Sequence, residues 1–427
     1  MNSLEIFFIV ICIGLSYLVL EIYVRSLVLS TRKKFQWLIT KDDELPEFSE
    51  EGLKKFLIHG YDSELGWVRK PNTEHNENGK HGTTLWTTNE KGARNNPNFE
   101  DKLSNISCYG DSFTFARQVN DNETWEHQLS KKNNSNVQNF GVGNYGIDQA
   151  LLLLKRNFLK NKTRIVIMAV VPDTISRILS IWKHYSEYGN TFGFKPRFII
   201  KNDSLVLIKN PIDDEKKYYN YTEYLEEIKK YDFFYEKKFK KDLIKIPYAI
   251  SILKNFRRNL GIIQSIKKSQ QVKKQNTNLE DDNDWQAMKY IMEKNMEWRI
   301  KLFNDNNAKK ILKKIIEDYV QFSREQKFIP LFIFLPQKDD LNFIKKNFHF
   351  YKEFSEELEL IKELYVIDIS KDLLRESNLD EMYSDNNDYG GHYSKIGNQK
   401  IGDMIYKKIN DLKLILEIFV SMLFFSK

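Results

Sequence analysis

Hydrophobic positions form one long uncharged run near the N-terminus and, from residue 104 onward, short runs that alternate with amphipathic segments. Five short runs have the composition of buried strands: 106–109, 137–140, 164–171, 329–335 and 364–368. Three segments have helical periodicity: 123–130, 149–158 and 394–410. This alternation predicts an α/β fold, in which a parallel sheet lies between helices on both faces.

The N-terminal run predicts a membrane anchor. Residues 6–20 carry no charge, and a helix over residues 4–24 would be just long enough to cross about 30 Å of hydrocarbon, with Glu21 near one interface. A cleaved signal peptide and a buried helix of a soluble domain are the alternatives, but the run lacks the basic residues and the small-residue site of a signal peptide. We therefore expect one uncleaved transmembrane helix over residues 1–25.

Charged residues around this helix predict the side of the membrane on which the rest of the chain lies. Glu5 precedes the run, and four basic residues follow it: Arg25, Arg32, Lys33 and Lys34. Because Lys and Arg accumulate on the cytoplasmic side of membrane helices, this distribution favours a cytoplasmic domain over a periplasmic one.

The patterns divide the chain into four regions: an anchor over 1–25, a lead-in region over 26–103, an α/β domain over 104–411 and an apolar tail over 412–427. The tail is too short to span a membrane. We expect it to lie at the membrane interface, to dock on the anchor, or to cover the core as a last helix.

A mainly helical insertion interrupts the α/β domain at about 213–327, where Lys, Glu, Tyr and Asn are frequent. Before it, the apolar segments 198–200 and 205–208 flank a polar turn, which predicts a β-hairpin. Within it, residues 267–284 are polar without apolar periodicity, so we expect a flexible loop there. We expect the insertion to cover the site or to bind a partner.

The composition excludes several functional classes. A net charge of +7, from 66 basic and 59 acidic residues, is mild for 427 residues, and no arginine-rich stripe or aromatic RNA-binding motif accompanies it, so we expect no nucleic-acid partner. Cys12 and Cys108 lie in the anchor and in a predicted buried strand, and we expect no disulfide between them. No Cys/His cluster has zinc-site spacing, and the sequence predicts no metal and no other cofactor.

Three segments carry candidate catalytic groups. Residues 108–115 (CYGDSFTF) place Ser112 just past the first strand, where a tight turn can present its hydroxyl above the sheet. Residues 139–146 (NFGVGNYG) follow the second strand, and their glycines let backbone N–H groups approach a ligand closely. Residues 385–398 (DNNDYGGHYSKIGN) place acidic residues and His392 on one loop before the last helix.

Together these groups predict a nucleophile, a base and an acid. A serine hydroxyl attacks a carbonyl only when a base removes its proton, and a carboxylate orients that base. Each segment also has an ordinary interpretation, as a turn or, for His392, as a helix cap.

In this order the three segments resemble the SGNH/GDSL hydrolase family over about residues 104–411. Upstream, residues 65–71 and 89–94 look like the lead-in of membrane-anchored members from bacterial envelope-glycan loci. The resemblance implies a three-layer α/β/α fold in which Ser112 attacks an ester carbonyl and His392 is its base.

The resemblance also implies an oxyanion hole and an acid. The backbone N–H groups of Ser112 and Gly143 would form part of the hole, and an Asp would orient His392. That Asp commonly lies three residues before the His, whereas Asp388 lies four before it. Asp388 is the first candidate for the acid and Asp385 a lesser one.

A second departure concerns the third strand. The family usually has an oxyanion-donating Asn at its end, and here Pro172 occupies that position and cannot donate. Either Asn144 or another donor replaces it, or the enzyme is slow, or its chemistry has shifted. Arg177 could hold an anionic substrate group, although a surface salt bridge is the favoured alternative.

The leading interpretation is hydrolysis or transfer of an O-acyl group, acetyl in the first instance, on a carbohydrate such as a polysaccharide. The carbohydrate comes from the resemblance alone, and a lipid or thioester substrate is the enzymatic alternative. The non-enzymatic alternative is a membrane-tethered glycan-binding or assembly protein that keeps the fold and lacks the activity.

Overall fold

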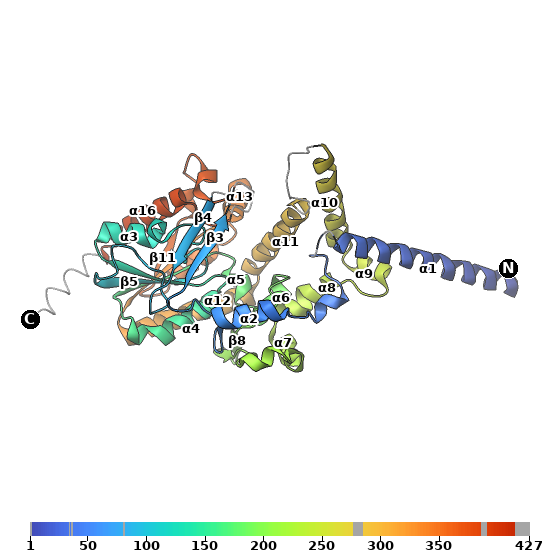
Figure 1. The fold of residues 1–427 in the computed structure, drawn as a ribbon, viewed down its shortest axis with the longest axis horizontal. Coiled ribbons are helices and arrows are strands. Elements are labelled where there is room, and N and C mark those ends of the chain that lie inside the picture. The colour runs from blue at the N-terminus through green and yellow to red at the C-terminus, as the bar shows by residue number, and fades with distance from the viewer. Residues whose placement is uncertain are drawn as a thin grey trace, which may run out of the picture.

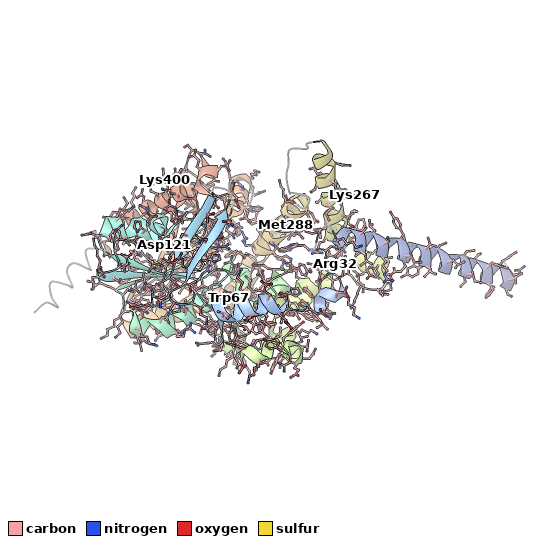
Figure 2. All side chains as sticks on the ribbon, viewed as in Figure 1. Arg32, Trp67, Asp121, Lys267, Met288 and Lys400 are labelled. Atoms are coloured by element: carbon pink, nitrogen blue, oxygen red, sulfur yellow. The ribbon has the colours of Figure 1, made fainter. Side chains whose placement is uncertain are left out.

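The N-terminal helix projects away from the rest of the molecule (Figure 1). The computed structural model describes residues 2–33, 35, 37–79, 82–275, 285–385 and 391–414. Helix α1 (Ser3–Arg32) is long and apolar enough to cross a membrane, and its most apolar window is not buried against the protein. It extends beyond the predicted anchor to Arg32, which Figure 2 labels. There Arg32 forms an ion pair with Asp43. The predicted tail lies outside the described residues from residue 415 onward.

A five-stranded parallel sheet forms the centre of the α/β domain. Its strands are β5 (Ser104–Gly110), β6 (Asn136–Gly141), β7 (Ile165–Val170), β10 (Ile329–Phe334) and β11 (Tyr365–Asp368). Their order across the sheet is β11-β10-β7-β5-β6, which is a doubly wound arrangement that reverses direction between β5 and β7. All five predicted strands are confirmed within two residues at each end.

Helices cover both faces of the sheet (Figure 1). Alternate residues of β7 explain why, because Ile165, Ile167 and Ala169 face one apolar core and Val166, Met168 and Val170 face another. Helices α3 (Trp125–Asn133) and α16 (Lys395–Asp411) cover the first core, and α4 (Ile147–Asn157) and α12 (Asn306–Gln326) cover the second. The predicted three-layer α/β/α architecture is confirmed.

Shorter elements complete the domain. Helices α5 (Thr174–Arg177) and α6 (Lys183–Ser186) follow β7, and three more lie in the C-terminal half: α13 (Lys338–Lys346), α14 (Lys352–Glu359) and α15 (Ser370–Leu373). The predicted hairpin is present as β8 (Arg197–Lys201) and β9 (Ser204–Ile208), which pair antiparallel.

The insertion is helical, as predicted. It contains α7 (Leu225–Tyr231), α8 (Lys240–Asp242), α9 (Tyr248–Lys254), α10 (Phe256–Gln275) and α11 (Trp285–Phe303) before α12. The loop prediction is wrong over 267–275, because α10 continues to Gln275 with Ile262 and Ile266 buried in the core that α10 and α11 share. The remainder of that predicted loop, 276–284, lies outside the described residues.

The lead-in region folds against the sheet and the insertion. It comprises α2 (Glu50–His59) and two small antiparallel pairs, β1 (Tyr61–Asp62) with β2 (Gly66–Trp67), and β3 (Glu74–Gly79) with β4 (Gly82–Thr87). These strands carry side chains to the carboxyl edge of the sheet, where the candidate site lies.

Candidate active site

Ser112 and Gly143 occupy equivalent places on neighbouring strands. Gly110 is the register partner of Gly141, and each candidate lies two residues beyond its glycine. The N–H of Val142 donates to the carbonyl of Gly110 at 3.1 Å, which ties the two strand ends together. The two segments are therefore neighbours at one edge of the sheet, as their sequence positions predicted.

Glycine is required at both strand ends because of close backbone contacts. A Cβ at Gly110 would lie 1.8 Å from the carbonyl oxygen of Ala169, and one at Gly141 would lie 2.2 Å from the nitrogen of Phe115. These neighbours are backbone atoms that cannot move aside. The glycines let the loop after Ser112 fold directly over the strand ends.

The backbone N–H groups of Ser112 and Gly143 are the candidate oxyanion donors. Within the described part of the chain, neither N–H donates a hydrogen bond to another protein group. The carbonyl of Gly143 accepts from the indole Nε1 of Trp67 at 2.8 Å, which fixes that peptide. Asn144 follows with a positive φ of 64°, which turns the backbone into the next helix. Two unpaired donors on adjacent strand ends are the feature that oxyanion stabilisation needs.

The third strand supplies no such donor. The N–H of Val171 is already bonded to the carboxylate of Asp111 at 2.9 Å, and Pro172 has no N–H. The role predicted for Asn144 remains a prediction.

His392 lies at the same edge of the sheet as Ser112. Its imidazole is 4.8 Å, centroid to centroid, from the ring of Phe113, the residue that follows Ser112. Ser112 is 6% exposed, and His392 is half-buried. Their side chains share no hydrogen bond in this structure, an arrangement common in ligand-free active sites, where such contacts tighten on substrate binding.

Gln118 orients the imidazole of His392. Its side-chain Oε1 accepts from the backbone N–H of His392 at 2.8 Å and lies 3.1 Å from Nδ1 of the same residue. Ser384 Oγ also donates to this oxygen, at 2.6 Å. Because a backbone N–H can only donate, the contacting atom is the amide oxygen, and Nδ1 must carry a proton to avoid two facing acceptors. Nε2 is then the unprotonated nitrogen and can act as the base.

The surroundings of His392 are cationic. Burial, followed by the charges of Arg117, Arg177 and Arg69, lowers the pKa of His392 to about 3. The imidazole therefore stays neutral, and able to accept a proton, over the whole physiological pH range.

Of the two candidate acids, only Asp385 lies among the described residues. Asp388 lies outside the described residues. Asp385 is on the described part of the loop, where its Oδ2 lies 2.7 Å from the position that a Cβ on Gly391 would occupy. The orienting contact seen at Nδ1 comes from Gln118, which the sequence did not single out.

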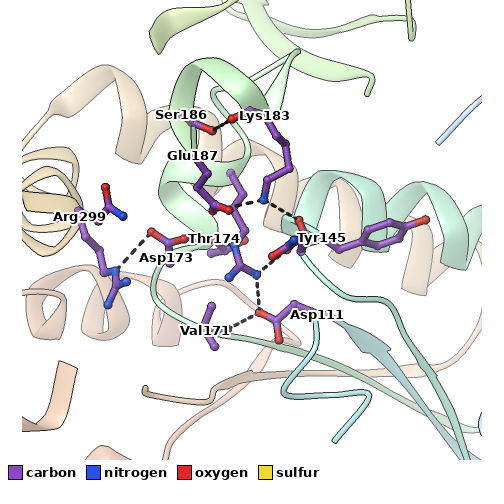
Figure 3. A network of polar contacts seen from close by, with 12 residues as sticks. Asp111, Tyr145, Val171, Asp173, Thr174, Lys183, Ser186, Glu187 and Arg299 are labelled. Atoms are coloured by element: carbon purple, nitrogen blue, oxygen red, sulfur yellow. Dashed lines mark hydrogen bonds and ion pairs between the residues drawn. The ribbon is translucent and has the colours of Figure 1, made fainter. Parts of the chain in front are cut away.

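Asp111, next to the candidate nucleophile, is structural in its contacts. Its carboxylate accepts from the N–H groups of Phe113 and Val171, the second of which Figure 3 shows. It also pairs with Arg177 Nη1 at 3.2 Å. The same Arg177 nitrogen donates to the carbonyl of Tyr145 at 3.0 Å. Arg177 is therefore buried, at 7% exposure, and the expected surface position is wrong, because its partners lie beneath the loops of the site.

This network reaches the helical insertion through Asp173. Arg177 Nε lies 3.2 Å from Asp173, and Arg299 of α11 lies 3.4 Å from the same carboxylate (Figure 3). Burial alone would raise the pKa of Asp173, but Arg299, Arg177 and Lys183 together lower it, so it stays ionised. The insertion thus fixes the floor of the site electrostatically.

Arg94 holds the loop that follows Ser112. Its Nη1 donates at 2.6 Å to the carbonyls of Phe115 and of Ala116, its Nη2 donates to the carbonyl of Val119, and its Nε pairs with Asp121 at 2.8 Å. The side chain is almost fully buried. Arg94 is the last residue of the lead-in segment 89–94, so this segment has a structural role.

A cleft of about 510 Å³ opens beside Gly143 and Asn144. Its wall includes aromatic side chains from the lead-in region and the loop before β8, and basic side chains from the lead-in region, the loop after Ser112 and α6: Phe56, Trp67, Trp86, Phe192, Arg69, Arg117 and Lys183. A glycan or another ring-containing substrate could stack on such a wall.

Comparisons with known proteins show limited similarity. No family model matches the chain, and no curated protein matches it. A solved structure described as a lipolytic protein of the G-D-S-L family, from Desulfitobacterium hafniense DCB-2, is similar with a TM-score of 0.32 and 13% sequence identity, over 71% of this chain and 98% of that chain. The proposed chemistry therefore rests on the geometry of the site.

Proposed function

We propose that this chain is a serine esterase or acyl-transferring enzyme, held at a membrane by α1, that acts on an O-acyl group, acetyl in the first instance, of a carbohydrate. The observation that supports the proposal is that Ser112, the N–H of Gly143 (unpaired among the described residues) and the oriented His392 lie at one edge of the sheet, with His392 against Phe113. The carbohydrate is suggested by the sequence resemblance and is compatible with the aromatic wall of the cleft.

The proposed reaction uses these groups as follows. Ser112 Oγ attacks the ester carbonyl carbon while Nε2 of His392 takes the hydroxyl proton. The negative charge that develops on the carbonyl oxygen is stabilised by the N–H groups of Ser112 and Gly143. The alcohol leaves with the proton from His392, and water or a sugar hydroxyl then releases the acyl group from Ser112. Both acceptors use the same residues.

A fluorophosphonate probe tests the nucleophile. The wild-type protein is expected to be labelled, Ser112→Ala is expected not to be, and His392→Gln is expected to react much more slowly. Ser204→Ala is a matched control and should be labelled like the wild type, since Ser204 is an exposed serine at the start of β9 and takes no part in the contacts of the site. Absence of labelling in every form would contradict the proposal and favour a glycan-binding or assembly protein.

Acetate release from O-acetylated oligosaccharides tests the reaction class. Release in water indicates a hydrolase. Faster release with transfer of acetyl to an added unacetylated oligosaccharide indicates an acyltransferase. Labelling at Ser112 without release from any acetylated sugar would contradict the carbohydrate part of the proposal.

A further inference from the structure

Arg69 is a cation without an anion in the described part of the molecule. Its guanidinium carbon lies 4.4 Å from the ring centroid of Trp86 and 4.3 Å from that of Phe115. Its Nε is buried without a hydrogen-bond partner, and no ion pair joins it to any described acidic residue. A guanidinium held on aromatic faces keeps its N–H edge available for an acceptor.

The position of Arg69 places that edge beside Gly143, one of the two candidate oxyanion donors. Nη2 lies 3.7 Å from the position of a Cβ built on Gly143, and Arg69, Gly143 and Asn144 all line the cleft. An acceptor bound there would be a neighbour of an acyl group whose carbonyl oxygen reaches the N–H of Gly143.

The charges around the cleft favour a ligand that carries one negative charge. Arg117 pairs with Glu77, and Lys183 pairs with Glu187 at 3.3 Å. Arg69 has no ion-pair partner of its own among the described residues, and burial, followed by the charges of Arg117 and Arg94, lowers its pKa to about 10 although Glu77 opposes this shift. A monoanion would relieve this repulsion, and a carboxylate fits the planar fork of a guanidinium through two hydrogen bonds.

We propose that Arg69 binds a carboxylate on the substrate, so that the enzyme prefers acylated acidic sugars such as uronic acids. This inference rests on the proposed function for the acyl group, but carboxylate binding itself requires no catalysis. Binding can therefore be measured in Ser112→Ala, where turnover is absent.

The experiment compares an O-acetylated galacturonate oligosaccharide with its methyl ester by calorimetry in the Ser112→Ala protein. We expect the acid to bind more tightly than the ester. Arg69→Gln should weaken binding of the acid by about ten- to a hundredfold, as for the loss of a charge-assisted hydrogen bond. The affinity for the ester should not change. Arg69→Lys, which keeps the charge without the fork, is expected to fall between. Unchanged thermal unfolding would confirm that the variants are folded.

Two outcomes would overturn the inference. Equal losses for acid and ester would assign Arg69 to the cleft wall or to the oxyanion, and no loss for either would remove it from binding. If the protein is not labelled by the fluorophosphonate but binds the acid in an Arg69-dependent way, the esterase proposal is contradicted and the carboxylate site is supported.

A different observation concerns the base of α1. The carboxylate of Glu21 accepts from the N–H groups of Tyr248 and Ala249 at the start of α9, so the acidic residue that directly follows the uncharged run is satisfied by the insertion. Beside this contact, apolar side chains of residues 246–256 face solvent: Ile246 is 72% exposed, Leu253 66%, Phe256 49% and Ile250 44%.

The geometry points to the lipid bilayer as the occupant of this face, which we call the α9 apolar face (Ile246, Ile250, Leu253 and Phe256). It is continuous with the exposed apolar surface of α1, and α9 packs on α1. Basic residues border it, namely Lys245, Lys254 and Arg257, all exposed, as expected of a segment that meets anionic headgroups.

Spin labels test this second proposal in the full chain reconstituted in vesicles of phosphatidylcholine and phosphatidylglycerol. Cys12→Ala removes the exposed native thiol, and labels are placed by Leu253→Cys and, as a control, by Leu360→Cys, which is 85% exposed on the α/β domain. We expect the label at 253 to be relaxed more by oxygen than by a water-soluble nickel complex, and the label at 360 to show the reverse. A label at 253 that behaves like the control, or that broadens by spin–spin contact with a second copy, would overturn the proposal.

Discussion

The side-chain oxygen of Gln118 lies 3.1 Å from Nδ1 of His392 and 2.8 Å from the backbone nitrogen of the same residue. One neutral amide thus fixes both the tautomer of the imidazole and the position of its loop. A carboxylate in this place would stabilise the imidazolium that forms during acyl transfer, whereas an amide oxygen orients the ring with a dipole alone. Among the described residues, the proposed base is therefore oriented by a neutral amide, while burial and the nearby arginines lower its pKa.

Gln118→Ala should slow the reaction. The ring would lose its acceptor at Nδ1. General base catalysis typically raises the rate about 10²–10⁴-fold, and a misoriented base would lose much of this enhancement. We expect kcat to fall by about ten- to a hundredfold, with KM little changed, because Gln118 contacts the base and not the cleft wall. Steady-state kinetics on an acetylated substrate would measure this. A change confined to KM would contradict the assigned role.

Gln118→Glu should alter the pH dependence of the same reaction. In the wild type the pKa of His392 is about 3, so kcat/KM should have no acidic limb above about pH 4. A carboxylate at Nδ1 favours the protonated imidazole and raises that pKa. The acidic limb should therefore move to higher pH, by one unit or more for an opposite charge at this distance. Profiles of kcat/KM from pH 3 to 9 would show it, and coincident profiles would contradict it.

The sequence predicted the parts of the site that depend on the sheet. Parallel strands end at a common edge, so Ser112 and Gly143, two residues past register partners, had to be neighbours. The helices also followed from periodicity, because their apolar faces are continuous.

The parts that depend on loop geometry could not be predicted. Gln118 reaches His392 because Ala116 and Gln118 adopt positive φ angles of 55° and 67°, a conformation that neither residue type signals in a sequence. Arg69 gains its place from the pairing of short strands in the lead-in region, far from Ser112 along the chain. The spacing used in the sequence analysis indicated only an acid before His392, and it gave no signal for Gln118 or Arg69.

Arg94→Lys should destabilise the protein strongly. A lysine cannot reach the carbonyls of three loop residues and Asp121 at once, and it would leave buried acceptors without donors. Breaking a buried pair of this kind typically costs about 3–5 kcal/mol in the free energy of unfolding. Denaturant unfolding would measure the loss. Arg375→Lys is the control, since that side chain is 79% exposed, and it should change stability by less than about 0.5 kcal/mol.

Gly141→Ala and Gly143→Ala should differ sharply although they lie two residues apart. A Cβ at position 141 would meet the backbone of Phe115 at 2.2 Å, whereas the one described atom near a Cβ at 143 is Arg69 Nη2, at 3.7 Å. We expect Gly141→Ala to unfold at clearly lower temperature or to be insoluble, and Gly143→Ala to fold like the wild type. Equal melting temperatures would show that the strand ends are less tightly packed than described.

Glu126→Gln should stabilise the protein at alkaline pH. Both carboxylate oxygens of Glu126 are buried without hydrogen-bond partners among the described residues, and burial raises the pKa of this group well above its usual value. The wild type must therefore take up a proton on folding, and its stability falls by about 1.4 kcal/mol per pH unit as the pH rises from the unfolded pKa toward the folded one. The amide is neutral at every pH and avoids this loss.

Denaturant unfolding at pH 5 and pH 8 would test this, with Glu123→Gln as the control. Glu123 pairs with Lys395 at 2.9 Å and accepts from the N–H of Asn120, and these contacts outweigh burial and lower its pKa. Its contribution is present above the unfolded pKa and is lost as the pH falls through the folded pKa, so Glu123→Gln should destabilise the protein at pH 8. The two variants should thus change stability in opposite directions at pH 8, and a gain for Glu126→Gln that is the same at both pH values would contradict a buried, protonated carboxyl group.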